Sequence, residues 1–171
     1  YIDPVRYISN KSSGKQGYEI ALALKKLGVK TTLIAGPSHI SFTNDLDVKR
    51  ITTGEEMINE VKKNLPVDIA VCAAAVTDFK PKNKNKNKIK KDKDSLDWIK
   101  FEKNYDILEY LGKNNKLKPK MLVGFSAETE NLIENSIKKF NQKYCDMIIA
   151  NDVSKKDFGF NVDYNKVSII T

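Results

Sequence analysis

Hydrophobic residues recur along this chain at two spacings, one typical of amphipathic helices and one typical of buried strands. Ile20, Leu24 and Leu27 share one face of a helix predicted over residues 14–27. Similar apolar stripes predict further helices over residues 53–65, 106–111 and 132–144. Short apolar runs predict strands over residues 30–35, 48–52, 68–74, 96–101, 121–125, 147–150 and 166–170.

Polar residues and glycines mark where several of these elements begin and end. Ser12 or Ser13 is expected to cap the first helix, and Gly28 is expected to end it. Thr53 and Glu56 have the spacing of a capping box at the start of the second helix. These signals support the predicted helix boundaries independently of hydrophobic periodicity.

The order of the predicted elements indicates an α/β fold. Strands alternate with helices, and the run over residues 68–74 is apolar enough for a central strand covered on both faces. We therefore expect one domain over residues 1–171, Rossmann-like and three-layered, with a largely parallel sheet and helices on both faces. In such sheets ligands bind at the carboxyl ends of the strands, so the segments that follow each strand are of most interest.

The net charge of +8 changes this picture at one place only. Residues 80–93 contain eight lysines and one acid, which leaves a net charge of +1 for all other residues. This segment lacks apolar periodicity before Ile89, so we expect a flexible loop. Such a loop can be simply solvated, or it can close over a triphosphate. A nucleic-acid-binding surface would more often spread its basic residues over several elements, so no nucleic-acid partner is expected.

Composition excludes several other classes of protein. No run of 18 apolar residues exists, and the N-terminus has no secretory signal pattern, so we expect a cytoplasmic protein without membrane association. Cys72 and Cys145 lie in apolar surroundings without metal-ligand spacing and are interpreted as buried thiols. The single histidine, His39, lies in a polar loop and is assigned no catalytic role.

Two segments that start or follow predicted elements could bind a nucleotide. The sequence from Ile8 to Gly17 places serines, a lysine and Gly14 at a helix N-terminus, where amide groups and the helix dipole favour anions. A serine-capped helix explains the same residues equally well, and neither a Walker A motif nor G-x-G-x-x-G is present. Ala73, Ala74 and Ala75 end a strand with small side chains, and Asp78 follows them, although helix packing and a solvated loop also explain these residues.

Two later segments are further candidates for contacts to a nucleotide. Gly124 thins a strand end, and Phe125 offers an apolar ring for base stacking, although a core phenylalanine is the simpler interpretation. Lys139 and Lys143 share a face of the following helix, which is also typical of an ordinary solvated helix surface. Each signal is weak alone, but together they follow the order expected of one nucleotide site.

Six segments, in chain order, resemble the phosphopantothenoylcysteine synthetase family. They are Ile2-Asp-Pro-Val-Arg-Tyr-Ile-Ser-Asn10, Ser12-Ser-Gly-Lys-Gln-Gly17, Ala73-Ala-Ala-Val-Thr-Asp78, Lys88-Ile-Lys-Lys91, Val123-Gly-Phe-Ser-Ala-Glu-Thr129 and Ala150-Asn-Asp-Val-Ser154. Members of the family usually begin with a strand and a Gly-Gly-Thr turn before the first segment, and they usually continue beyond the position of Thr171 with a strand and a helix. The chain is therefore expected to lack both of these ends. The family often has Asn-Pro-Asp where this chain has Asn104-Tyr105-Asp106.

The resemblance implies a two-step ligase of coenzyme A synthesis. A carboxylate of phosphopantothenate attacks the α-phosphorus of CTP with release of pyrophosphate and with the help of Mg²⁺, and the amine of L-cysteine then displaces CMP. ATP is a less favoured nucleotide. Family members are homodimers and are often fused to a flavin decarboxylase. The alternative from the residues alone is a Rossmann-like nucleotide-binding or reductase-type protein.

The resemblance also implies a set of functional residues. Asn10 and Lys88 are expected to be catalytic, and Arg6 and Asn10 are expected to bind phosphopantothenate. The expected nucleotide contacts are Gly14, Ala73, Ala74, Ala75, Asp78, Lys88, Tyr105, Asp106, Ile107, Leu108, Phe125, Lys139 and Lys143. No metal ligand is assigned. Lys88 suits the first step because its charge offsets that of the phosphates, and the neutral carboxamide of Asn10 suits the second because it can polarise a carbonyl.

Overall fold

The computed structural model describes residues 1–90, 99–114, 116–154 and 164–171. Its helices are α1 (Lys15–Lys26), α2 (Gly54–Asn64), α3 (Ile107–Lys113) and α4 (Leu132–Lys143). Its strands are β1 (Thr32–Ala35), β2 (Asp47–Arg50), β3 (Ile69–Cys72), β4 (Phe79–Pro81), β5 (Phe101–Lys103), β6 (Met121–Glu128), β7 (Met147–Asp152) and β8 (Val167–Ile170). Among the described residues, no helix is long and apolar enough to cross a membrane.

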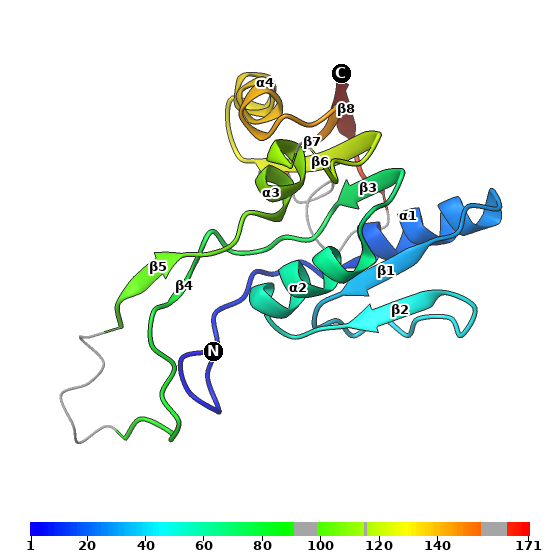
Figure 1. Ribbon diagram of the computed structural model, residues 1–171. Coiled ribbons are helices and arrows are strands. Elements are labelled where there is room, and N and C mark those ends of the chain that lie inside the picture. Colours follow the sequence, from blue (N-terminus) through cyan, green and yellow to red (C-terminus); the bar gives the residue numbers. More distant parts are fainter. Residues whose placement is uncertain (91–98, 115, 155–163) are drawn as a thin grey trace.

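The main sheet has the strand order β3-β6-β7-β8. Its first three strands are parallel, and β8 runs antiparallel to β7. Strands β1 and β2 form a separate parallel pair. In Figure 1 these two strands point in the same direction as β3. The expected largely parallel α/β fold is therefore confirmed, but the described residues contain no strand ladder between β1 and β3.

Helices cover both faces of the β1–β2 pair. Successive side chains of a strand point to opposite faces, so two neighbouring residues of β1 show what packs on each face. Leu33 of β1 packs beside Tyr18 and Ala21 of α1. The next residue, Ile34, packs on the opposite side against a cluster that includes Met57 and Ile58 of α2. Helices α1 and α2 thus lie on opposite faces of this pair, as the three-layer prediction requires.

The larger core lies between the main sheet and helices α3 and α4. Leu122 of β6 and Ile148 of β7 are fully buried there, next to Leu108 and Leu111 of α3. A Cβ atom at Gly124 would lie 2.6 Å from Leu108 Cδ2 and 2.7 Å from Ile148 Cδ1. Glycine at this position of β6 therefore allows α3 to approach the sheet closely, which fixes the start of α3 near the strand ends.

The helices lie where the sequence predicts them, to within two residues at each end, but the cap of α1 differs from the prediction. The N-cap of α1 is Gly14 (φ +78°), whereas Ser12 or Ser13 was expected to be the cap. The hydroxyl oxygens of these serines instead accept hydrogen bonds from the amides of Gly14 (3.4 Å) and Lys15 (3.3 Å). That prediction was wrong because a glycine in the left-handed region lets the chain turn directly into the helix. The predicted stop at Gly28 (φ +79°) is confirmed.

The prediction of a structureless lysine loop was partly wrong. Lys80 and Pro81 belong to β4, which pairs antiparallel with β5, and this hairpin extends away from the main sheet (Figure 1). The rings of Phe79 and Phe101 contact each other across the two strands, with centroids 5.4 Å apart. The pairing of β4 with β5 joins residues that are far apart in the chain, so no local sequence signal predicts it. The strand predicted over residues 96–101 begins at Phe101, and residues 96–98 lie outside the described residues, as do residues 91–93 of the loop.

Candidate active site

The start of α1 lies against the carboxyl end of β3. A Cβ atom on Gly17 would lie 3.7 Å from Ala73 Cβ, so the first turn of α1 and the alanine segment are neighbours. The hydroxyl of Ser38, which follows β1, donates a 2.6 Å hydrogen bond to the carbonyl of Ser13 and so holds the turn before Gly14. Two of the segments predicted to bind nucleotide are therefore brought together, with Ala74 and Ala75 exposed beside them.

Asn10 lies in the same turn and is exposed. Its Oδ1 atom accepts a 2.8 Å hydrogen bond from the amide of Ser12, which orients the carboxamide. Its side-chain amide group donates no hydrogen bond within the described part of the chain. The side chain therefore presents an oriented, neutral N–H donor at the surface.

Asn104 connects the segment that carries Asp78 to the start of α3. Its amide donates to the carbonyl of Asp78 (2.8 Å), and its side chain donates to the carbonyl of Thr77 (3.0 Å). Its Oδ1 atom accepts from the amide of Tyr105 (2.9 Å). A Cβ atom at Gly54 would lie 2.9 Å from this side chain. Asp78 is exposed, and the ring of Tyr105 lies 4.8 Å from the ammonium group of Lys80.

Sequence reasoning missed this role of Asn104. The side chain donates to the carbonyl of Thr77, which lies 27 positions earlier in the chain, and no local pattern reveals such a bond. Gly54 was interpreted only as part of a capping box, which the structure confirms at Thr53 and Glu56. The close approach of Asn104 explains why a residue without a side chain is suited to position 54.

Of the two α4 lysines predicted to contact the nucleotide, Lys139 reaches β6 and Lys143 reaches the start of α3. Lys139 donates a 2.7 Å hydrogen bond to the carbonyl of Phe125. Lys143 forms ion pairs with Asp106 (2.8 Å) and Glu109 (2.9 Å). Although partial burial acts to lower it, these two carboxylates hold the pKa of Lys143 above its ordinary value. Lys139 and Lys143 are thus held in place rather than extended into solvent.

Ile107 and Leu108 belong to the hydrophobic core, which limits how they can contact a nucleotide. The two residues are 9% and 7% exposed and form part of the core on the buried side of α3. Only their main-chain groups can face a ligand. The residue before them, Asp106, caps α3 by accepting a 2.8 Å hydrogen bond from the amide of Glu109.

Glu109 should make the folded protein sensitive to acid. Hydrogen bonds from Lys113 and Lys143 lower the pKa of Glu109 to about 2. Because the unfolded chain binds this proton near pH 4.5, the stabilising contribution is complete above that pH and is lost as the pH falls toward 2. We expect Glu109→Gln to destabilise the protein at pH 5 by more than at pH 3, as measured by urea unfolding midpoints.

A matched control for this prediction is Glu134→Gln. Glu134 is an exposed residue of α4 without an ion pair to any described residue. The control should shift the midpoint equally at the two pH values. An equal shift for Glu109→Gln would contradict the expected role of the ion pairs.

Lys88 and Arg6 occupy a separate region, where the N-terminal segment meets the lysine-rich segment. Lys88 is exposed and forms no hydrogen bond or ion pair with any residue that the structure describes. Arg6 pairs with Asp3, and this guanidinium holds the pKa of Asp3 well below its ordinary range. Among the described residues, no hydrogen bond or ion pair joins Lys88 to Asp78 or to Lys143.

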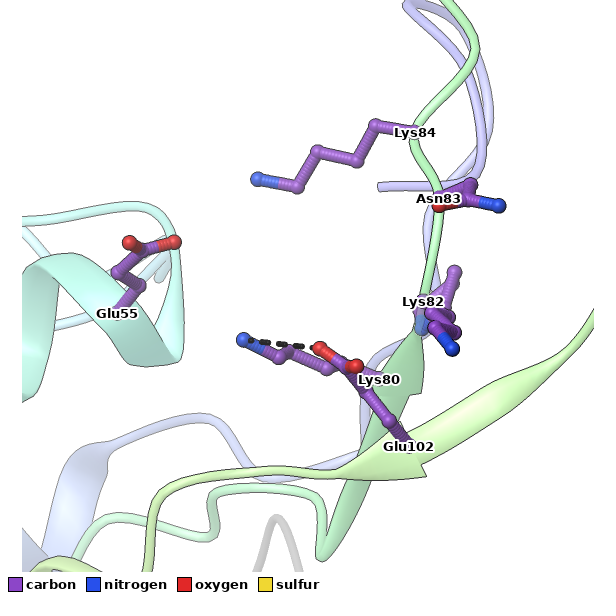
Figure 2. Close-up of a pocket in the computed structure, with 7 residues that line it drawn as sticks. Glu55, Lys80, Lys82, Asn83, Lys84 and Glu102 are labelled. Atoms are coloured by element: carbon purple, nitrogen blue, oxygen red, sulfur yellow. Dashed lines mark ion pairs between the residues drawn. The ribbon is translucent and has the colours of Figure 1, made fainter.

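An open hollow of about 360 Å³ lies beneath the β4–β5 hairpin. Its lining residues are Glu55, Lys80, Pro81, Lys82, Asn83, Lys84 and Glu102. Figure 2 shows Lys80 and Lys84 reaching toward Glu55 of α2, and Lys80 forms an ion pair with Glu102 (3.5 Å). The two glutamates offset most of the lysine charge. None of the residues predicted to bind nucleotide lines this hollow, so we do not assign it to the nucleotide.

Cysteine and carboxylate side chains near this site differ in what chemistry they suit. Burial raises the pKa of the Cys72 thiol to about 12, so this side chain stays protonated and is a poor nucleophile at neutral pH. The described residues contain no group of three or more His, Cys, Asp or Glu side chains suited to a metal ion. Mg²⁺ that accompanies a nucleotide is commonly held by phosphates and one or two carboxylates, and the exposed Asp78 fits that smaller requirement.

The chain is similar to known proteins over its whole length. Residues 1–171 match the family described as DNA/pantothenate metabolism flavoprotein C-terminal domain. The chain is 43% identical over 171 residues to the coenzyme A biosynthesis bifunctional protein CoaBC of Borreliella burgdorferi, covering 99% of this chain and 43% of that protein. It is 38% identical over 170 residues to CoaBC of Bacillus subtilis, covering 98% of this chain and 41% of that protein.

A solved structure of a related domain has the same fold. The crystal structure of the C-terminal domain of CoaBC superposes with a TM-score of 0.74 at 34% identity. The match covers 88% of this chain and 70% of that one. The chain thus spans about two fifths of the length of the curated relatives it matches.

Proposed function

Because this chain belongs to the family of DNA/pantothenate metabolism flavoprotein C-terminal domains, we propose that it is a phosphopantothenate–cysteine ligase that uses CTP. The observation that carries the proposal is the family match over every residue from 1 to 171. The CoaBC relatives are named for coenzyme A biosynthesis, and the substrates proposed here belong to that process. The arrangement of α1, the alanine segment and the α4 lysines supports a nucleotide at the carboxyl ends of β3 and β6.

The first step forms an acyl-nucleotide. A carboxylate oxygen of phosphopantothenate attacks the α-phosphorus of CTP, and the bond to the pyrophosphate oxygen breaks. Negative charge accumulates on the phosphates, and the ammonium group of Lys88 neutralises part of it. When bound, Mg²⁺ would supply further charge neutralisation, and the exposed carboxylate of Asp78 would be suited to hold it. Gly14 and the alanine segment allow the phosphates to approach the main chain closely.

The second step forms the amide. The free amine of cysteine attacks the acyl carbon, the amine loses a proton, and the bond between that carbon and the phosphate oxygen breaks to release CMP. The side-chain amide of Asn10 donates a hydrogen bond to the carbonyl oxygen as it gains negative charge. Because the carboxamide is neutral, it does not bind the phosphate groups as an ion pair and stays available for the carbonyl.

The proposal extends to assembly. The two curated relatives are bifunctional proteins, and we propose that this chain works beside a flavin decarboxylase, as the family resemblance implies. We also propose a homodimer. Phe79 and Phe101 support it, because their contacting rings are 49% and 50% exposed on a hairpin that extends from the main sheet. Paired aromatic side chains on such a hairpin are suited to cover by a second copy.

Nucleotide preference can be tested by thermal denaturation with Mg²⁺ and one nucleotide at a time. A ligand at 100 times its Kd adds about 2.7 kcal/mol of stability to the folded protein, and a weaker ligand at the same concentration adds less. We therefore expect CTP, the proposed substrate, to raise the melting temperature more than ATP or UTP. NADPH is the control for the alternative, a reductase-type Rossmann protein. Stabilisation by NADPH without any effect of CTP would contradict the ligase proposal and favour that alternative.

A further inference from the structure

Asp3 has an unusual position for a carboxylate near the beginning of the chain. It is 1% exposed, and each of its oxygens has a different set of partners. Oδ1 accepts hydrogen bonds from the amides of Val5 (2.9 Å) and Arg6 (2.8 Å), which forms a local turn. Oδ2 accepts from Nε of Arg6 (2.9 Å) and from the amide of Ile89 (3.2 Å). The second oxygen therefore connects two segments that are 86 positions apart.

The same two segments are joined by two more hydrogen bonds. Nη2 of Arg6 donates to the carbonyl of Ile89 (3.1 Å), so both main-chain groups of Ile89 are bound by the Asp3–Arg6 pair. The amide of Asn85 donates to the carbonyl of Ile2 (2.9 Å). The N-terminal segment thus holds the lysine-rich segment at Asn85 and at Ile89, on either side of Lys88.

We propose that Asp3 and Arg6 act as a positioning pair that fixes the main chain of Lys88 for nucleotide activation, an inference that rests on the proposed ligase function. Lys88 has no side-chain partner in the described structure, so its reach is set by where its backbone is held. A long, flexible side chain is effective only if its anchor point is fixed. The pair supplies that anchor from the same segment that leads to Asn10.

Arg6 also joins this anchor to the substrate. Its side chain is 39% exposed, and its Nε and Nη2 atoms are occupied by Asp3 and Ile89. Nη1 has no hydrogen bond with the described residues and can therefore meet the phosphate of phosphopantothenate. One guanidinium then contacts both the bound substrate and the segment that carries Lys88.

Asp3→Asn is the most selective test of the positioning pair. Asparagine keeps an oxygen for the amides of Val5 and Arg6 but replaces the oxygen that accepts from the Arg6 side chain and from Ile89. The matched control is Asp68→Asn, which removes an exposed ion pair to Lys120 (2.7 Å) away from this region. Arg6→Lys is a second variant, which keeps the positive charge but cannot bind Asp3 and Ile89 together.

Amide hydrogen exchange tests the anchor without reference to activity. In the full wild-type chain we expect the amides of Asn85 and Ile89 to be protected. In Asp3→Asn and in Arg6→Lys the amide of Ile89 should exchange about tenfold faster or more, while amides of β6 are unchanged. An unprotected Ile89 amide in the wild type, or equal exchange in wild type and both variants, would overturn the anchor.

Kinetics test whether the anchor positions Lys88. We expect Asp3→Asn to lower kcat for pyrophosphate release by about 10- to 100-fold, with little change in the KM for CTP. Asp68→Asn should match the wild type. Faster exchange at Ile89 together with unchanged kcat would overturn the positioning role. Absence of pyrophosphate release from the wild type would instead contradict the proposed function, and the exchange measurement would still decide the anchor.

Discussion

Replacing Lys88 with glutamine should reduce phosphopantothenate-dependent pyrophosphate release by a factor on the order of 10²–10³, the usual loss when a preorganised stabilising group is removed. Glutamine is similar in size to lysine but lacks its charge, so the variant isolates electrostatic stabilisation of the phosphates. Lys88 is exposed and has no partner among the described residues, so folding should be unaffected. The measurement is single-turnover pyrophosphate release, with thermal denaturation as the check on folding.

Asn10→Asp gives the complementary result that makes this prediction specific. Aspartate keeps the oxygen that accepts from the amide of Ser12 and loses the amide donor proposed for the acyl carbonyl. We expect this variant to release pyrophosphate but to form amide slowly, with accumulation of the acyl-nucleotide. If Lys88→Gln and Asn10→Asp both fail at the same step, the division of roles between these residues is wrong.

Replacing Gly112 with alanine should destabilise the protein by about 2 kcal/mol, within the usual range for overpacking. A Cβ atom at Gly112 would lie 1.9 Å from the carbonyl oxygen of Lys143 and 3.3 Å from Tyr144 Cβ. The obstacle is main chain and cannot rotate away, so the last turn of α3 must move from the end of α4. Alanine favours a helix over glycine by at most about 1 kcal/mol, which does not offset this clash.

The melting temperature measures this effect directly. About 2 kcal/mol corresponds to a decrease of roughly 4–8 °C for a chain of this size. Gly36→Ala is the matched control, because its nearest neighbouring atom would be Ile51 Cδ1 at 3.9 Å. The control should melt close to the wild type. A wild-type melting temperature for Gly112→Ala would show that α3 and α4 do not pack this closely.

The displacement should also weaken nucleotide binding. Lys143 supplies the carbonyl that Gly112 faces, and its side chain pairs with Asp106 and Glu109 across the same helix contact. Moving α3 relative to α4 would therefore separate residues that we propose contact the nucleotide. The gain in melting temperature on adding CTP should be smaller for Gly112→Ala than for Gly36→Ala.

Local signals in the sequence predicted most elements of the fold. The capping box at Thr53 and the stop at Gly28 require only residues near each other in the chain, and both are confirmed. The predicted N-cap of α1 was wrong. Serine and glycine are both common at helix starts, and contacts in the folded protein decide between Ser13 and Gly14. The β4–β5 pairing was missed because it joins residues on either side of a polar segment, at a distance that periodicity does not report.

In the candidate site too, local sequence signals identified some residues, whereas residues that act through long-range contacts were missed. Residue types and order pointed to Asp78, Lys139 and Lys143, and the structure places the lysines of α4 against β6 and α3. The residues that hold these groups were not foreseen. Asn104 and Glu109 act through long-range hydrogen bonds and ion pairs, which depend on how strands and helices pack rather than on sequence spacing.

Phosphopantothenate-dependent cleavage of CTP by the purified protein tests the central claim most directly. With Mg²⁺, CTP and phosphopantothenate we expect pyrophosphate release, and with cysteine added we expect CMP and phosphopantothenoylcysteine in amounts equal to the pyrophosphate. Without cysteine, CMP and the amide product should not appear. Absence of pyrophosphate release from either CTP or ATP under these conditions would contradict the assignment of this chain as a nucleotide-dependent ligase.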